Sequence, residues 1–354
     1  MAIHFDMERM ERVREAHDRW WKGTLNRPLT AVTLTDAWPV ERRAAAPLLD
    51  QAHCGDFSWS AEQVIERLDE ELSRCEFLGD AFPMVNFDAF GPGVLAEFCG
   101  ARLDNSSGGV WFFPEEAKEL ADIHVHYDPE NKWVKRIKEL YRAGMERWNG
   151  SVILGMPDLG GVMDVAATLR GSENLLMDLY DEPEEVLRLN REIQDAWYAA
   201  YQDFAQVLKP QNGFSNWMRL LSAEPSYSIQ CDFSYMIGNP MFKQFVLETL
   251  REDTERLAHT IYHLDGIGEL NHLEDILSLE KLDAVQWVPG DGQPSAPHWL
   301  DVYRTIQKSG KGMMIVGSPR DYLEVLREIH GTPYSVHFLP ASQRELAMEL
   351  INAR

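Results

Sequence analysis

Short apolar runs recur along the chain and alternate, in its C-terminal half, with helical patterns. Four of the runs in that half are rich in β-branched or aromatic residues: "TIYHL", "DAVQW", "GMMIVG" and "YSVHF". Each is apolar throughout rather than alternating, which is typical of strands buried on both faces of a parallel sheet. Earlier runs of the same kind are "LTAVTL", "PMVNF", "SVILGM" and "YSIQCD". The pattern therefore predicts about eight strands.

The helical patterns between these runs carry clear start and stop signals. In "SPRDYLEVLREIHG", Ser318 suits the N-cap, Pro319 the first helical position, and Gly331 the turn beyond the end. Strands and helices that alternate with short links imply parallel strands and right-handed crossovers. We predict an α/β fold in which the strands close a (β/α)₈ TIM barrel. A doubly wound open sheet is the alternative, but the glycine-rich nucleotide motifs that accompany many such sheets are absent.

The expected organisation is a single domain over residues 1–354. Residues 1–80 are expected to hold an N-terminal helical extension and the first strand, because "MAIHFDMERMERVREAH" has the pattern of an amphipathic helix. Residues 40–150 are less regular, and they predict a decorated N-terminal third rather than a separate domain.

The net charge of -23 argues against a nucleic-acid partner, whose phosphates need a basic surface, and against anionic membranes. No apolar run approaches the roughly 20 residues of a membrane span. The charged N-terminus does not resemble a signal peptide. The four cysteines form no CxxC motif and are expected to be reduced thiols. These features predict a cytoplasmic protein.

Polar residues follow several of the predicted strands. Because functional side chains of a barrel sit at the carboxyl ends of its strands, we expect these residues around one cavity. They are Asp88, Asp158, Asp232, His263, Asp265, Gln286, Trp287 and His337.

Three stretches of the C-terminal half resemble the uroporphyrinogen decarboxylase superfamily: "CDFSYMIGNPMFKQFVLETLRED", "HLDGIGELNHLEDILSLEKLDAVQW" and "YSVHFLPASQRELAMELI". Two earlier stretches, "NFDAFGPGVLAEFCGA" and "LYDEPEEVLRLNREI", are also similar to it. The resemblance implies a single (β/α)₈ barrel. Arg27 and Pro28 match the start of the arginine-rich segment of the haem-pathway enzymes, but the remaining arginines are missing. An octacarboxylate substrate needs many cations, so we do not expect the haem-pathway activity.

The other branch of that superfamily contains zinc-dependent methyltransferases of corrinoid systems, which carry a His–x–Cys motif and a late Cys. The resemblance places these ligands on His263, Asp265 and His337, and it implies a divalent metal, zinc first, with a corrinoid supplied by a partner protein. Iron, nickel or manganese would also suit nitrogen and oxygen ligands. Glu269 and His272 are either partners that orient the ligands or part of a solvated helix start. Asp265 before a glycine and a histidine at the last strand are also compatible with purely structural roles.

Three functions follow as hypotheses. The first is metal-dependent methyl transfer on a small methylated or carboxylated substrate. The second is a metal-independent lyase or decarboxylase, with Asp88 or Asp232 as general acid and His263 or His337 relaying protons. The third is a non-catalytic ligand-binding protein. The predicted catalytic set is Asp88, Asp158, Asp232 and Glu269, and the predicted substrate-binding set is Trp217, Arg219, Tyr235, Gln286 and Trp287. The expected partners are a small molecule, a corrinoid protein and a second copy in a homodimer.

Overall fold

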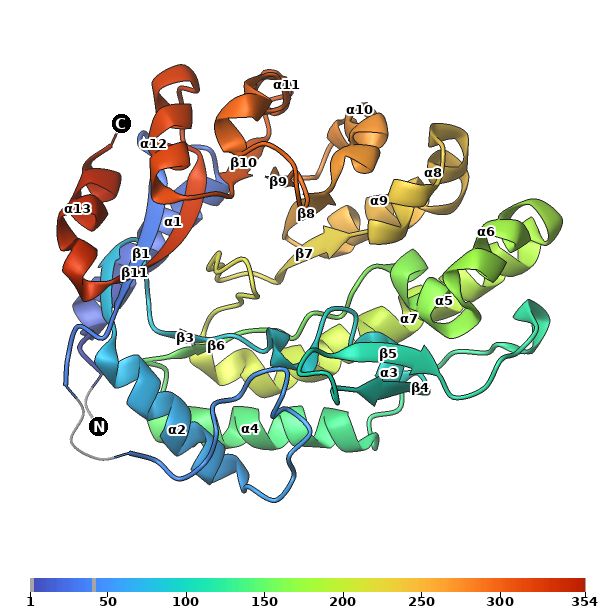
Figure 1. The fold of residues 1–354 in the computed structure, drawn as a ribbon, viewed down its shortest axis with the longest axis horizontal. Coiled ribbons are helices and arrows are strands. Elements are labelled where there is room, and N and C mark those ends of the chain that lie inside the picture. The colour runs from blue at the N-terminus through green and yellow to red at the C-terminus, as the bar shows by residue number, and fades with distance from the viewer. Residues whose placement is uncertain (1–2, 40–42, 354) are drawn as a thin grey trace.

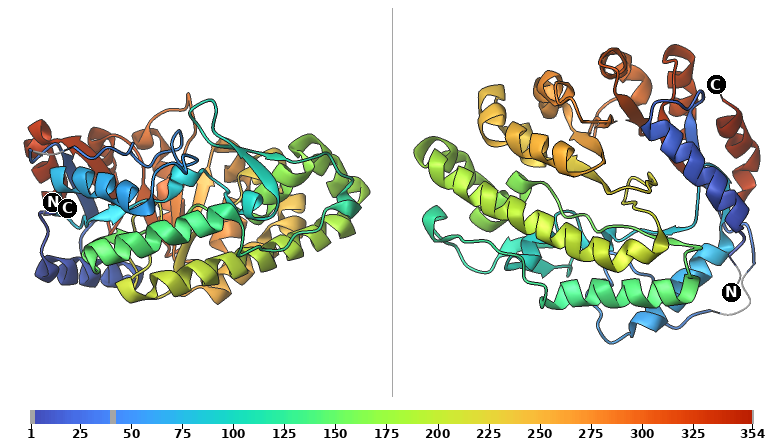
Figure 2. Two further views of the ribbon diagram at one scale, coloured as in Figure 1. Left: turned by 90° about the horizontal axis from the view of Figure 1, so that it is seen from below. Right: turned by 180° about the vertical axis from the view of Figure 1, so that it is seen from behind.

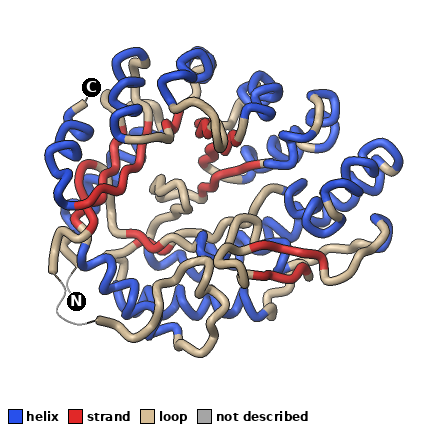
Figure 3. The backbone as a smooth tube through the Cα atoms, in the orientation of Figure 1, coloured by secondary structure: helices blue, strands red, loops and turns tan. Residues whose placement is uncertain are grey.

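The structure is a computed structural model that describes residues 3–39 and 43–353. It shows a mixed α/β fold with a mainly parallel seven-stranded sheet in the order β2-β1-β11-β10-β9-β8-β7. The strands are β1 Leu29–Thr35, β2 Glu76–Gly79, β7 Ser226–Gln230, β8 His259–Asp265, β9 Ala284–Val288, β10 Gly312–Ile315 and β11 Tyr334–Pro340. Helices lie along the outside of these strands (Figure 1), and the tube view separates the two layers by colour (Figure 3).

Four short strands stand outside this sheet. Strands β3 Met84–Val85 and β6 Ile153–Leu154 form a parallel pair, and β4 Ala101–Asp104 and β5 Trp111–Pro114 form an antiparallel hairpin. All eight predicted runs contain a strand, but they pair as two sheets rather than as one ring. The prolines at 83 and 157 flank the short pair, and single backbone bonds join it to neighbours, as from the Met156 amide to the Ser215 carbonyl. Strand β2 was not predicted, and it runs antiparallel to β1.

Most of the longer helices lie around the outside of the strands. The longer helices are α1 Met7–Trp21, α2 Ala61–Arg74, α4 Lys132–Trp148, α5 Val162–Arg170, α6 Ser172–Asp181, α7 Pro183–Leu208, α9 Leu247–Arg256, α11 Leu300–Lys308, α12 Pro319–Glu328 and α13 Arg344–Asn352. By contrast with the others, α1 packs its Trp20 and Trp21 against the core on the inner face of the strands. The shorter ones are α3 Leu95–Phe98, α8 Asn239–Phe245 and α10 Leu273–Leu277. The predicted caps of α12 are confirmed, because Ser318 and Asp321 form a capping box. None of the helices in the described ranges is long and apolar enough to cross a membrane.

Apolar residues predominate in the strands because both faces of the sheet are covered. On β8, Tyr262 and Leu264 belong to the large core beneath the helices, whereas Ile261 belongs to a second core with Trp20 and Met218. The segment between α7 and β7, which carries Met218, lies in the middle of the molecule between the two sheets in both face views (Figures 1 and 2). It therefore fills the space that the inner faces of the strands enclose.

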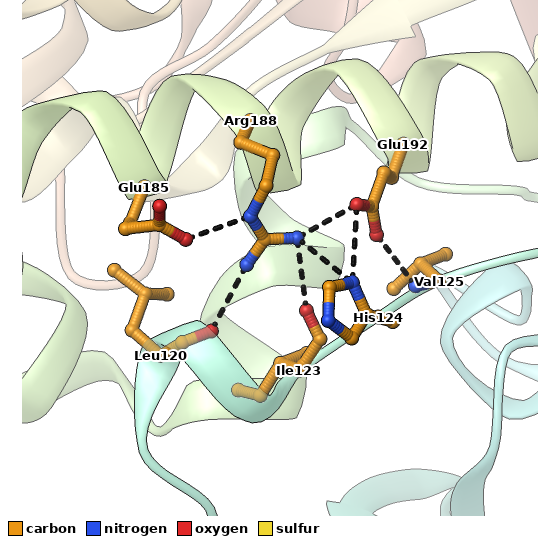
Figure 4. Close-up of polar contacts among 7 residues, drawn as sticks. All are labelled: Leu120, Ile123, His124, Val125, Glu185, Arg188 and Glu192. Carbon is orange, nitrogen blue, oxygen red and sulfur yellow. Dashed lines mark hydrogen bonds and ion pairs between the residues drawn. The ribbon is translucent and has the colours of Figure 1, made fainter.

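Arg188 on α7 ties the segment after the β4–β5 hairpin to the helical layer (Figure 4). Its guanidinium donates to Glu185 and Glu192 at 2.7 Å each, and to the carbonyl oxygens of Leu120 and Ile123 at 3.1 Å. Two carboxylates and two backbone carbonyls thus share one cation that is only 27% exposed. This contact holds in place the short 3-10 helix Leu120–Asp122 and the extended residues that follow it.

We predict that Arg188→Met loosens residues 120–125 and lowers the free energy of unfolding by about 1–3 kcal/mol, because hydrogen bonds of a half-buried charge are lost. Arg191→Met is the control on the same helix, since Arg191 pairs with Glu252 on the surface and such pairs contribute less than about 1 kcal/mol. Hydrogen exchange of residues 120–125 with thermal unfolding measures both. Equal effects of the two variants would contradict the role given to Arg188.

Candidate functional site

The parallel register of three strands brings polar side chains to one edge of the large sheet. Gln230 on β7 pairs with His263 on β8, and His263 pairs with Gln286 on β9. Because side chains alternate along a strand, His263 and Asp265 lie on the same face as Ile261. That face belongs to the inner side of the sheet, opposite the helices.

Asp232, His263 and Asp265 form the one group of metal-ligating residues found within the described ranges, and their candidate ligand atoms all lie within 4.8 Å of one another. Asp232 follows β7 at the start of a short 3-10 helix, Asp232–Met236. The Nε2 atom of His263 is 3.9 Å from the Oδ2 atom of Asp265. Directly after Asp265 the chain turns at Gly266, whose φ of 84° favours glycine. A Cβ atom there would also lie 3.0 Å from the ring of Tyr235.

Gln286 determines which nitrogen of His263 faces this group. The Oε1 atom of Gln286 is 2.5 Å from Nδ1 of His263, and its Nε2 atom lies 3.2 Å from the sulfur of Met314. A thioether only accepts hydrogen bonds, so the amide nitrogen faces Met314 and the amide oxygen faces the imidazole. Nδ1 therefore carries the proton, and the lone pair of Nε2 points toward Asp265. Burial also lowers the pKa of His263, which favours the neutral ring.

The surrounding carboxyl groups resist ionisation. Burial raises the pKa of Asp158 to about 7, and the nearby charges of Asp232 and Asp164 add to this effect. The pKa values of Asp164 and Asp232 are raised too, first by the protein atoms around them and then by a neighbouring carboxylate. Asp232 touches solvent at the rim, yet it is surrounded by protein on its other sides. The site is thus acidic, and it favours protons or a cation.

Asp164 on α5 was not among the predicted residues. Its Oδ1 atom accepts the Phe233 amide at 2.7 Å, and its Oδ2 atom accepts the Gly161 amide at 3.2 Å. It thereby ties the start of α5 to the turn that begins at Asp232. An acidic residue three positions after a glycine that follows a strand is a helix-start signal, and that signal would have placed Asp164 at this edge.

The structure does not bring His337 to the group, which corrects the predicted ligand set. His337 is 4% exposed, and its ring lies 5.4 Å from that of Tyr322 on α12. Alternation along β11 turns His337 toward the helices, whereas its neighbour Phe338 faces inward. Burial lowers the pKa of His337 to about 4, so the ring is neutral. Asp232 takes the third position in the group.

Trp287 is the second predicted residue that faces away from the site. It is fully buried beside Trp299, with the ring centroids 5.3 Å apart. Its neighbour Gln286 has the opposite orientation and contacts His263. The one-residue alternation of a strand separates the two, so Trp287 belongs to the core.

Of the predicted substrate-binding residues, Trp217 and Tyr235 lie beside the group, whereas Arg219 lies toward β11. The rings of Trp217 and His263 are 4.9 Å apart, edge to face. The guanidinium of Arg219 lies over the ring of Phe338, 4.8 Å from its centroid. Tyr235 lines a surface hollow of about 320 Å³ together with Asp232 and Asp265.

The remaining predicted residues differ in access. Asp158 is 8% exposed and lies 3.4 Å from the Gln230 amide nitrogen, whereas Asp88 is exposed and near Arg219. Glu269 is fully buried, and its Oε2 atom accepts from Tyr262 at 3.2 Å. His272 is also fully buried, and it donates to the Ser234 carbonyl and stacks on Phe242. Both therefore brace the turn around the site rather than orient His263.

A larger hollow of about 780 Å³ lies at the other edge of the sheet, beside α1 and His259 at the start of β8. Two pairs of its charged side chains neutralise one another, Glu8 with Arg12 and Asp18 with Lys22. Side chains that already neutralise one another offer little to a ligand. The smaller hollow at the carboxyl ends is the better candidate.

No model of a known protein family matches the chain. A tRNA (guanine-N(1)-)-methyltransferase from Desulfitobacterium hafniense (strain Y51) is 30% identical over 148 residues, which are 38% of this chain and 52% of that protein. The chain thus spans about half the length of the curated relative it matches. A methyltransferase from Methanosarcina mazei has a similar solved structure, with a TM-score of 0.61 and 13% identity over 96% of this chain and 98% of that one. This likeness shows that the two proteins share a fold.

We predict that Gly161→Ala disturbs the site, because its Cβ atom would lie 2.1 Å from the Gln230 carbonyl oxygen. The overpacking should lower the free energy of unfolding by about 1–3 kcal/mol. Gly109→Ala is the control, since the nearest atom to its Cβ atom is 3.5 Å away. Denaturant unfolding compares the two variants. Unchanged stability of Gly161→Ala would show that Gly161 and the Gln230 carbonyl are not in close contact.

Proposed function

We propose that the protein is a metal-dependent methyltransferase whose divalent metal is held by Asp232, His263 and Asp265. The observation that carries the proposal is the convergence of these three ligand atoms within 4.8 Å, with the His263 tautomer set by Gln286. The shared fold with a methyltransferase and the partial match to another support methyl transfer. The proposal includes membership of the uroporphyrinogen decarboxylase superfamily and completion of a (β/α)₈ barrel by the two sheets.

The donor set fits such a metal. One neutral imidazole nitrogen and two carboxylates suit zinc, and they equally suit iron, nickel or manganese. A divalent cation would also compensate the negative charge of the surrounding carboxylates, whose pKa values are raised by burial and by the neighbouring carboxylates. Bound there, the metal would supply Lewis acidity that lowers the pKa of an acceptor heteroatom.

The residues of the chain have separate roles in this proposal. Gln286 keeps the proton of His263 on Nδ1. Asp158, with a pKa of about 7, is able to hold or release one proton at neutral pH near Gln230. Trp217 covers one side of His263 and limits the approach of water. The reacting part of the substrate would lie between these groups.

The methyl carrier is proposed to be the corrinoid of a partner protein, as the sequence resemblance implies. The name of the Desulfitobacterium protein concerns tRNA, but a net charge of -23 disfavours a nucleic-acid substrate for this chain. A small molecule is the substrate class that fits a hollow of about 320 Å³.

A metal-independent lyase is the second candidate function. The observation in its favour is Asp158, a buried carboxyl group whose pKa of about 7 suits a general acid. Such an enzyme would keep its activity in the presence of a chelator. The methyltransferase would lose activity there, so one assay separates the two.

We predict that the purified protein binds one divalent metal and that His263→Ala and Asp232→Asn abolish stoichiometric binding. Asp291→Asn is the control, because Asp291 lines the same hollow but is not part of the group. Metal content and titration calorimetry with zinc, iron, nickel and manganese measure the effect. The proposal fails if the wild-type protein binds none of these metals or if Asp291→Asn behaves like the ligand variants.

We predict that Gln286→Met weakens metal binding by about 10–100-fold, because nothing then holds the proton of His263 on Nδ1. Gln286→Glu should restore most of the affinity, since its carboxylate still accepts from Nδ1. Competition with a chelator of known affinity gives both values. Equal affinities for Gln286→Met and the wild type would remove the role of Gln286.

We predict that the metal-loaded protein transfers the methyl group of methylcobalamin to an added small thiol or alcohol. The change in cobalamin absorbance follows the reaction. His263→Ala should react at least about 100-fold more slowly. Loss of a residue that only hydrogen-bonds a metal ligand lowers activity by up to about 100-fold, and loss of the ligand itself should lower it at least as much. Transfer at the same rate by metal-free protein would contradict the metal's role.

A further inference from the structure

The inner side of the site also carries a cation that the proposed metal chemistry does not use. Arg219 makes no ion pair or hydrogen bond through its side chain with any residue in the described ranges. Its guanidinium lies over the ring of Phe338, 4.8 Å from the ring centroid, and Asp88 acts on it only as a nearby charge. The Arg219 nitrogens have no hydrogen-bond partner, yet they are not among the buried side-chain nitrogen and oxygen atoms that lack one. They are therefore accessible to solvent. Burial nevertheless lowers the pKa of Arg219. A desolvated guanidinium without a carboxylate partner is uncommon in proteins.

The backbone is strained where it presents this cation. Arg219 has a φ of 57°, in the left-handed region that residues other than glycine rarely adopt. Tyr334 holds the turn by donating to the carbonyl oxygens of Met218 and Arg219, at 3.0 and 2.7 Å. The Asn216 side chain accepts the Met218 amide at 3.0 Å. Strain that several contacts maintain often marks a ligand-binding position.

The same turn faces two walls of the site. Trp217 places its ring edge to face with His263 on β8, and Arg219 places its guanidinium over Phe338 on β11. Strands β9 and β10 lie between those two strands in the sheet. The cation and the candidate metal group therefore lie toward different strands, and Trp217 is on the side of His263.

Asp88 does not neutralise Arg219. The two charges influence each other, since Arg219 opposes the rise that burial causes in the pKa of Asp88. No ion pair joins them in the part of the chain that the structure describes, and Asp88 is exposed. The guanidinium keeps its planar pair of donors available, and these match the two oxygens of a carboxylate.

We propose that Arg219 binds a carboxylate of the substrate, so that the substrate is a small organic acid. This inference rests on the proposed function only in one respect, which is that the reacting end of the substrate lies at the candidate metal group. The carboxylate lies against Arg219 beside Phe338, and the rest of the molecule extends along Trp217 toward His263. The carboxylate thus fixes which end of the substrate reaches Asp232, His263 and Asp265.

Matched pairs of small probes test the inference: acetate against acetamide, and benzoate against benzamide, at constant ionic strength. Calorimetry and Trp fluorescence measure their binding to the wild type, Arg219→Gln and Arg219→Lys. We expect at least one carboxylate to bind about tenfold or more tightly than its amide, and Arg219→Gln to remove that preference. Arg219→Lys should retain part of it. Arg320→Gln is the surface control, because Arg320 pairs with Glu349 away from the site.

The Asp265→Asn variant separates this inference from the metal proposal. A preference for carboxylates that persists in metal-free Asp265→Asn and in chelated wild type supports binding at Arg219. If the preference disappears there, the metal binds the anion and the inference is overturned. It is also overturned if neither carboxylate is preferred over its amide, or if Arg219→Gln keeps the preference. If the wild type binds no metal but still prefers carboxylates over their amides, only the proposed function is contradicted.

Discussion

The parallel register of β7, β8 and β9 is the constraint on which the site depends. Backbone hydrogen bonds fix Gln230, His263 and Gln286 at one level, and all three strands end at the same edge. Asp232 and Asp265 then follow from the chain itself, because each comes directly after that level. A slip by one residue would turn His263 toward the helices and replace it with an apolar neighbour. The site therefore exists only in this pairing.

Burial on both faces stabilises that strand pairing and also shifts the pKa values of the polar groups beside it. Apolar residues predominate on the helix side and on the inner side of the strands, and the carboxylates of the site lie beyond or at their ends. Burial raises the pKa values of Asp158 and Asp164, and the charge of Asp232 nearby raises both further. Carboxylates thus gather on the side of β8, where a metal would compensate their charge, whereas Arg219 supplies a positive charge on the side of β11.

Local pattern was enough to predict the strands and several side chains of the site. The apolar runs coincide with all the long parallel strands. His263 and Asp265, expected close together at the end of β8, lie 3.9 Å apart. Periodicity did not reveal that β3 and β6 pair apart from the large sheet, because their regular pairing covers only two residues each. Nor did it reveal β2, whose partner β1 lies far along the chain.

The misplaced residues share one cause. His337 and Trp287 were assigned from their distance to the end of a strand, but their side chains face the helices, and only the packing of Tyr322 and Trp299 decides that. The contact of Gln286 with His263 was not predicted, because it depends on the register of two strands. Asp164 comes from a helix start on another part of the chain. Side-chain direction and contacts over long sequence distances require the folded structure.

The most direct test is anomalous diffraction at the zinc absorption edge from crystals grown with zinc. We expect one strong peak bounded by the Nε2 atom of His263 and the carboxylates of Asp232 and Asp265. The same crystals of Asp232→Asn should lack it. A peak elsewhere, or no peak from crystals grown with saturating zinc, would contradict a metal centre at this edge of the sheet.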